Sequence, residues 1–196
     1  MGARDLTFDE VSHTYRLGGA RVPSVTQILA PLSSFEGIPP HVLDAKRDLG
    51  QRVHFACQLD DEHDLDESSV EPDVEPYLAG WRRFLRESGA VVVHNEQQVA
   101  DPVLRFAGTL DNVLEVPTYT GRWLVDKKTC FSLPMAVGPQ TAAYMRAFAD
   151  PTVTRRAALR LRPDGTYRFD PLTGADDWSA FMACLCLHRF KESHAS

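Results

Sequence analysis

The sequence predicts an α/β domain in which helices flank a central mixed β-sheet, with a β-hairpin near the N-terminal end. Segments of helical periodicity lie on both sides of a run of strand-like segments, and apolar residues make up 43% of the 196 residues. A chain of this length and composition can bury a sizeable core, and no linker or internal repeat divides it. We therefore expect a single domain over residues 1–196.

The N-terminal part is predicted to form a hairpin followed by two helices. Residues 8–25 have a strand pattern on both sides of Gly18-Gly19, a pair that favours a primed turn. A short helix should follow, capped by Ser24 or Thr26. Pro39-Pro40 suits the first turn of the next helix, because proline is tolerated at that position.

The remaining elements alternate as expected for a sheet covered by helices. Tyr77, Trp81 and Phe84 recur at helical spacing and predict a buried helical stripe. The turn residues 162–165 separate the last two strands. In chain order we expect a helix at 72–88, strands at 90–99, 103–116 and 121–128, a helix carrying Gln140, strands at 152–162 and 166–171, and a final helix at 175–193.

Two carboxylates and a lysine on the predicted sheet are the candidate catalytic residues. Asp111 lies in one strand, three residues after Gly108, and Asp126 and Lys128 close the next strand. Since side chains alternate along a strand, Asp126 and Lys128 point to the same face. Asp-x-Lys alone usually marks a solvated strand end, so the prediction depends on the order and spacing of the whole set.

These residue types suit the hydrolysis of a phosphodiester. The anionic phosphodiester repels hydroxide, so a cation has to neutralise it and lower the pKa of a water molecule. Converging carboxylates offer the hard oxygen ligands that Mg²⁺ or Mn²⁺ prefers. Lys128 would stabilise the negative charge that develops in the transition state. The expected activity is that of a metal-dependent nuclease.

The arrangement resembles the PD-(D/E)XK nuclease superfamily, in particular its RecB-like branch of phage-type exonucleases. The resemblance also covers Gly50-Gln51-Arg52-Val53-His54. It implies a restriction-endonuclease-like core in which His54, Asp111, Asp126 and the backbone carbonyl of Lys127 bind the metal. A lone helical histidine is more often structural, and the accompanying motifs favour the ligand role here.

The same resemblance gives roles to three further residues. Gln140 and Tyr144, four apart on one helix, would brace the catalytic lysine or touch DNA, although simple packing on the sheet is the alternative. Glu96 would be a further carboxylate near the metal, or else a solvated strand residue. Lys127 stands where relatives usually carry an apolar residue, so its amine should extend to solvent or meet a carboxylate.

The resemblance implies a Mg²⁺- or Mn²⁺-dependent DNA exonuclease acting in phage or prophage recombination, repair or genome processing. The sequence contains no P-loop, so a helicase or recombinase partner would have to supply any ATP-driven unwinding. Three alternatives remain open: a structure-specific endonuclease of the same fold, a DNA-binding or assembly protein with a vestigial site, and a hydrolase of small phosphate esters.

The net charge of −6 is unusual for a DNA-binding protein, but the negative charge is concentrated in one segment. Residues 60–75 contain nine acidic residues and no Lys or Arg, so the rest of the chain is net basic. We expect this acidic stretch to be a solvated connection between helices. Arginines cluster at positions 82–86 and 155–162; Arg156, Arg160 and Arg162 would share a strand face and contact DNA phosphates, or simply solubilise the surface.

The four cysteines are expected to be reduced thiols, mostly buried: Cys57, Cys130, Cys184 and Cys186. Their spacing predicts neither a zinc site nor an iron–sulfur cluster. No apolar run approaches the ~20 residues of a membrane span, and the first residues lack a signal-peptide pattern. We expect a cytoplasmic protein, located in the bacterial host if a phage encodes it.

Overall fold

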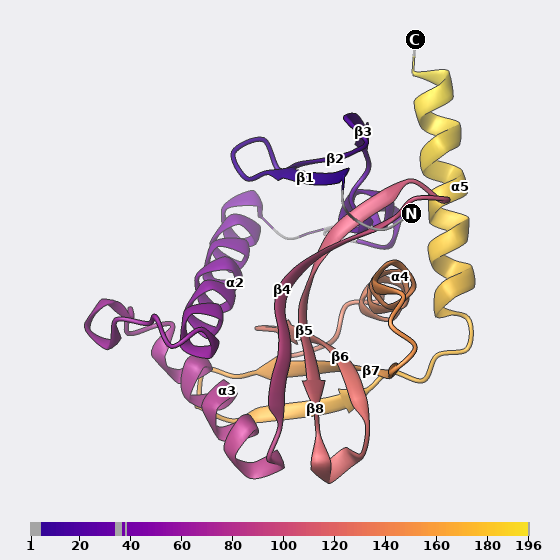
Figure 1. Cartoon of the computed structure of the whole chain (residues 1–196). Helices are drawn as coiled ribbons and strands as arrows, with labels where there is room; N and C mark the ends of the chain where they lie inside the picture. Colours follow the sequence, from indigo (N-terminus) through magenta and orange to yellow (C-terminus); the bar gives the residue numbers. More distant parts are fainter. Residues whose placement is uncertain (1–4, 34–36, 38, 196) are drawn as a thin grey trace.

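The computed structural model describes residues 5–33, 37 and 39–195 of the chain. It has an α/β fold built around a mixed five-stranded sheet (Figure 1). The strands are adjacent in chain order: β4 (Val91–Asp101), β5 (Phe106–Glu115), β6 (Arg122–Lys128), β7 (Val153–Leu161) and β8 (Tyr167–Pro171). The predicted fold class is confirmed at this level.

One parallel pair interrupts an otherwise antiparallel sheet. The β4–β5, β5–β6 and β7–β8 pairs are antiparallel, whereas β6 and β7 are parallel. A parallel pair needs a crossover, and helix α4 (Val137–Phe148) supplies it. The loop between β6 and α4, residues 129–136, therefore leaves the sheet directly after Lys128.

Helices cover both faces of the sheet. Helices α2 (Pro40–Asp61) and α3 (Glu75–Ser88) pack on one face, where Trp81 and Phe84 are fully buried. Helices α4 and α5 (Asp177–His194) pack on the other face around Phe106 and Phe181. Figure 1 shows these pairs on opposite sides of the strands, so a strand residue belongs to one core or the other according to its side-chain direction.

The N-terminal segment adds a small sheet and a short helix. Strands β1 (Leu6–Asp9), β2 (Thr14–Leu17) and β3 (Ala20–Val22) form a three-stranded antiparallel sheet. Gly18 and Gly19, with φ of 59° and 78°, make the turn between β2 and β3, as predicted. Ser24 caps α1 (Val25–Ile28) through a capping box with Gln27, which decides between the two predicted caps.

The element boundaries agree closely with the sequence prediction, with one clear shift. The helix predicted from residue 72 begins at Glu75, because residues 71–74 form a turn closed by the N–H of Val74 and the carbonyl of Glu71. Short 3₁₀ helices occur at Ala30–Leu32, Glu67–Ser69 and Pro117–Tyr119. Within the described part of the chain, no helix is both long and apolar enough to cross a membrane.

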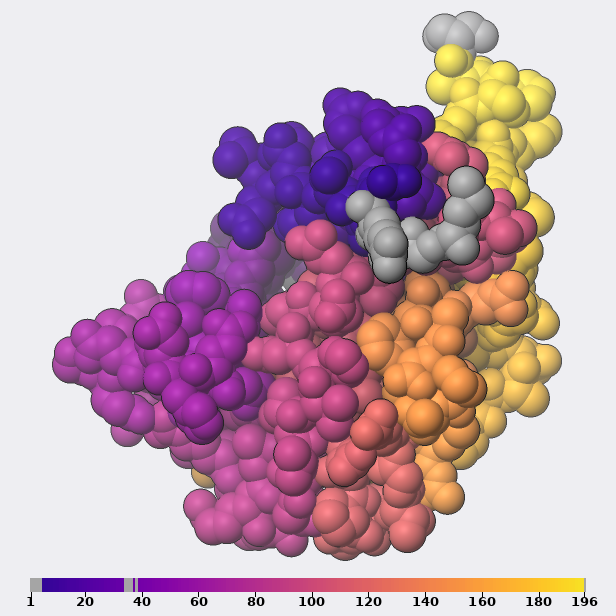
Figure 2. Space-filling model, in the orientation of Figure 1, coloured from indigo at the N-terminus to yellow at the C-terminus, as the bar shows by residue number. Residues whose placement is uncertain are grey.

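The acidic connection between α2 and α3 projects from the left of the molecule (Figures 1 and 2). It is more than a solvated loop, because its carboxylates pair with arginines. Arg52 contacts Glu71 and Asp73, with 2.8 Å between Nη1 and Asp73 Oδ1. Arg82 contacts Asp60 and Glu67. Each of these exposed ion pairs contributes little to stability. They nevertheless neutralise part of the acidic segment and leave Arg52 and Arg82 less available to other partners.

The cysteines differ in exposure. Cys57 and Cys184 are buried, Cys130 is half-buried and Cys186 is exposed, and all four are free thiols. Cys184 and Cys186 therefore lie on different faces of α5, because residues two apart on a helix do not face the same way. The expectation that the thiols are mostly buried holds for only two of the four.

Candidate functional site

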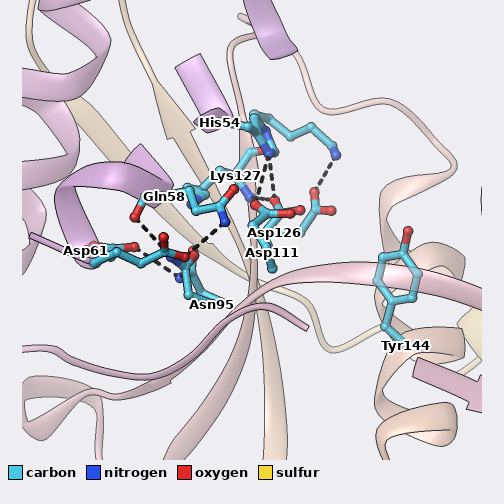
Figure 3. A network of polar contacts seen from close by, with 12 residues as sticks. His54, Gln58, Asp61, Asn95, Asp111, Asp126, Lys127 and Tyr144 are labelled. Atoms are coloured by element: carbon cyan, nitrogen blue, oxygen red, sulfur yellow. Dashed lines mark hydrogen bonds and ion pairs between the residues drawn. The ribbon is translucent and has the colours of Figure 1, made fainter. Parts of the chain in front are cut away.

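Residues from four separate elements converge at one end of β6. His54 comes from α2, Glu96 from β4 and Asp111 from β5, and one ligand atom from each lies within 4.8 Å of the others. Asp126 and Lys128 flank this group from β6 (Figure 3). The structure therefore brings together the residues that the sequence predicted to form the site.

The main chain of Lys127 fixes two of these side chains. Its N–H donates to Asp111 Oδ2 at 2.6 Å, and its carbonyl oxygen lies 3.0 Å from His54 Nε2. A neutral imidazole that donates from Nε2 leaves Nδ1 as a lone-pair donor. That nitrogen faces Asp111 Oδ2 at 3.6 Å and Glu96 Oε1 at 3.9 Å, so it points into the acidic cluster. The Lys127 carbonyl keeps a second lone pair for a cation.

Glu96 lies in the site itself, which is one of the two positions that the sequence analysis left open. The register pairs Asn95 with Asn112 and Gln97 with Leu110, which puts Glu96 opposite Asp111 on the neighbouring strand. Residues opposite each other in an antiparallel pair project to the same face. Glu96 has a left-handed φ of 44°, a strained conformation for a non-glycine residue that often marks functional sites. Its Oε1 is buried without a hydrogen-bond partner among the described residues.

Asp126 and Lys128 form an ion pair on the predicted shared face of β6, in which the carboxylate is buried and the lysine is half-buried. Lys128 Nζ lies 2.6 Å from Asp126 Oδ2, and Asp126 is only 1% exposed. Burial raises the pKa of Asp126 despite the neighbouring lysine. Burial lowers the pKa of Lys128, but the carboxylates of Asp126 and Asp111 outweigh it and raise the pKa overall. The lysine is therefore held in its charged form.

The site carries more negative than positive charge. Burial also lowers the pKa of His54, yet the carboxylates of Asp111 and Glu96 raise it above its ordinary value of 6.5. Three neighbouring groups, one acid and two bases, thus all bind protons more tightly than usual. An additional cation would relieve the same excess of negative charge, which makes the cluster suitable for a metal ion.

Tyr144 lies to one side of this cluster (Figure 3), and Gln140 is its neighbour on α4. Tyr144 is buried, and Gln140 Nε2 donates to its hydroxyl at 3.3 Å. The tyrosine ring packs over Gly108, where a Cβ atom would lie 2.6 Å from Tyr144 Cε1. The glycine three residues before Asp111 is thus required by close packing. The ring is thus fixed beside the strand that carries Asp111, which is the packing alternative of the sequence analysis, and a role beside Lys128 or on DNA stays a prediction.

Lys127 behaves differently from the sequence expectation. Its side chain points to the α2–α3 face and is fully buried, so it does not extend to solvent. The ammonium lies 5.0 Å from the centroid of the Trp81 ring, and it has no hydrogen-bond partner in residues 5–33, 37 and 39–195. Asp61 is the nearby carboxylate: burial raises its pKa and Lys127 lowers it. The cation is stabilised by an aromatic face and by charge, without a direct contact.

A polar network that the sequence analysis missed surrounds this lysine. Trp81 Nε1 donates to Asp61 Oδ1 at 2.9 Å, and Asn112 Nδ2 donates to Asn95 Oδ1 at 3.2 Å. Asn95 in turn donates to the carbonyl of Gln58 (Figure 3). No sequence pattern marks this group, because its members come from α2, α3, β4 and β5. Lys127 lies between the network and the metal cluster.

Arg156 and Arg160, two of the three arginines predicted to contact DNA phosphates, are instead paired with carboxylates of the protein. Arg156 is nearly buried and pairs with Asp177 at 2.9 Å, and Arg160 pairs with Asp170 at 2.7 Å. Both guanidinium groups therefore stabilise the fold by joining β7 to α5 and β8, because buried charges need partners. Arg162 differs: it is half-buried, and its guanidinium carbon lies 5.7 Å from the centroid of the Phe131 ring.

The sequence matches no protein-family model and none of the curated proteins. The assignment of a function therefore depends on the geometry above.

We predict that the affinity of the cluster for Mn²⁺ falls as the pH is lowered. His54 must lose its proton to act as a ligand, and because its pKa is raised, this competition extends above the ordinary pKa of 6.5. Affinity should fall about tenfold per pH unit below that pKa, as measured by calorimetry between pH 8 and pH 6. In a His54→Gln variant this dependence should largely disappear. An identical slope in the variant would exclude His54 as a ligand.

Proposed function

We propose that this chain is a divalent-metal-dependent deoxyribonuclease of the PD-(D/E)XK superfamily, in its RecB-like branch, and that it degrades DNA from an end. One observation carries the proposal. Ligand atoms of His54, Glu96 and Asp111 converge within 4.8 Å beside the Asp126–Lys128 ion pair. A group of metal ligands can activate a water molecule and neutralise a phosphodiester, and a charged lysine beside it can stabilise the developing negative charge.

The donor set fits the proposed Mg²⁺ or Mn²⁺. Glu96, Asp111 and Asp126 offer hard carboxylate oxygens, and a single imidazole nitrogen is compatible with Mn²⁺. Glu96 Oε1 and Asp126 Oδ1 are buried without a hydrogen-bond partner within the described residues, so they are free to coordinate, whereas Asp126 Oδ2 faces the Lys128 ammonium. A bound cation would neutralise the phosphate and lower the pKa of the attacking water.

The protein side chains would provide orientation and charge. Lys128, held as an ammonium, can donate to the attacking water or to a phosphate oxygen, where it stabilises the charge that develops in the transition state. His54 and Asp111 are fixed by the main chain of Lys127, which limits their reorganisation during the reaction. Action from an end, and a helicase or recombinase partner, are supported by the resemblance of the motifs alone.

The test is digestion of end-labelled linear DNA, single- and double-stranded, beside a closed circle. Each substrate is incubated with Mg²⁺, Mn²⁺ or EDTA. Metal-dependent loss of linear DNA only would support the exonuclease, and cutting of the circle would support an endonuclease of the same fold. A parallel assay with a chromogenic nucleotide ester tests the alternative of a small-ester hydrolase, which would cleave the ester but not DNA. If no substrate is cut and calorimetry detects no metal binding, the proposal is wrong.

A further inference from the structure

The loop that follows Lys128 presents an aromatic ring to solvent beside the candidate site. Phe131 is 81% exposed, and Met135 on the same loop is 76% exposed. Single exposed apolar residues are common on protein surfaces. Here two large ones lie on one short connection that starts at the catalytic lysine, which is the position where a bound substrate strand would pass.

The main chain of this loop is held at Phe131. The carbonyl of Phe131 accepts a hydrogen bond from Arg160, and the Nε of Arg160 is bound to Asp170 at 2.7 Å. The start of the loop lies near α2, because a Cβ atom on Gly50 would lie 3.6 Å from Thr129 Oγ1. A ring on an anchored backbone is pre-organised for binding, because little conformational freedom remains to be lost.

A cation accompanies the ring. Arg160 is the register partner of Lys128, and Arg162 lies two residues further along the chain, directly after the end of β7. The Arg162 guanidinium carbon is 5.7 Å from the centroid of the Phe131 ring. Unlike Arg156 and Arg160, Arg162 has no salt bridge to a carboxylate among the residues that the structure describes. The pair therefore offers an exposed π-face and a positive charge side by side.

We propose that Phe131 stacks on a nucleobase of the DNA strand that enters the site, while Arg162 contacts an adjacent phosphate. An aromatic face next to a cation is the combination that binds single-stranded nucleic acid without reading its sequence. The inference deepens the proposed nuclease function and rests on it. Stacking at this point would hold the strand beside Lys128 and favour substrates whose terminal bases can unpair.

The experiment measures binding without turnover, with Ca²⁺ in place of Mg²⁺. Oligonucleotides carry 2-aminopurine at successive positions from one end, because stacking on an aromatic ring quenches its fluorescence. For the wild type we expect quenching at one position. Phe131→Ala should abolish it and weaken the dissociation constant roughly 5- to 150-fold, whereas Phe131→Trp should retain both. Phe190→Ala, which removes another exposed phenylalanine far along α5, is the matched control.

The salt dependence of binding distinguishes the contribution of Arg162 from that of Phe131. Arg162→Gln should reduce the slope of log affinity against log salt by about one, whereas Phe131→Ala should leave it unchanged. If Phe131→Ala binds as tightly as the wild type while the wild type still binds and digests DNA, the stacking inference is wrong and the nuclease proposal stands. If the wild type neither binds nor digests DNA, both are wrong. Thermal melting verifies that each variant is folded.

Discussion

Replacement of Lys128 by Met is expected to lower the rate of DNA cleavage roughly 100- to 1000-fold. The Lys128 ammonium lies 2.6 Å from Asp126 Oδ2, so Met keeps most of the side-chain volume but removes the positive charge that we expect to contact the attacking water or the phosphate. Substrate binding should change much less, because the effect lies in the transition state. Single-turnover cleavage of labelled linear DNA at saturating Mg²⁺ measures the difference directly.

A matched substitution keeps this test specific. Lys191→Met removes a lysine from the exposed end of α5 and should leave the cleavage rate unchanged. Asp126→Asn should abolish cleavage as Lys128→Met does. Full activity in either the Lys128 or the Asp126 variant would refute the site assignment, provided that thermal melting shows folded protein.

Loss of activity in Asp126→Asn should not be accompanied by loss of stability. Burial raises the folded-state pKa of Asp126 above 3.8, so the folded chain binds this proton more tightly than the unfolded chain. The resulting stabilisation is present below the unfolded pKa and is lost as the pH rises through the folded pKa. At neutral pH the burial of this charge therefore opposes folding of the metal-free protein. Asparagine removes that cost together with the ion pair to Lys128, so the two effects offset each other and the net change in stability should be small.

Replacement of Asp61 by Ala is expected to lower the free energy of unfolding by about 3–5 kcal/mol. The substitution removes the acceptor of Trp81 Nε1 and the carboxylate whose charge compensates the buried ammonium of Lys127. An uncompensated buried charge is among the most costly changes in a protein core. Urea denaturation followed by circular dichroism measures the change.

A double-mutant cycle tests whether Lys127 is the cause. Lys127→Met alone should raise the free energy of unfolding by about 1–3 kcal/mol, because it replaces a buried amine that has no hydrogen bond with an apolar chain of similar volume. In the Lys127→Met background, Asp61→Ala should cost clearly less than in the wild type. Additive effects would contradict the charge coupling and leave the Trp81 hydrogen bond as the main loss.

The sequence predicted the elements well where the local pattern is strong. The strands around Asp111 and Asp126 begin and end within three residues of their expected limits, since strand alternation and the flanking turns are local signals. The common direction of Asp126 and Lys128 followed from the same alternation. Their place beside His54 was expected only from the resemblance of the motifs, because the contact joins α2 to β6 across more than 70 residues.

The positions of the remaining charged side chains depend on contacts between segments that are distant in the sequence. The position of Glu96 opposite Asp111 depends on the β4–β5 register and on a left-handed residue in mid-strand, which no sequence pattern marks. Arg156 and Arg160 look like free basic residues in the sequence, and only the packing of α5 and β8 supplies the carboxylates that neutralise them. The burial of Lys127 has the same origin, because the helix that covers it brings both Trp81 and Asp61.

The sequence by itself determined the fold class, the order of the elements and the face of β6 that carries Asp126 and Lys128. These properties follow from periodicity, which neighbouring residues fix. The tertiary structure decided which charges are free and which are paired. It places Glu96 in the cluster, one of the two alternatives that the sequence left open, pairs Arg156 and Arg160 with carboxylates, and buries Lys127 beside the site. Ion pairing and burial depend on the partner that arrives from elsewhere in the chain, and so they appear only when the chain has folded.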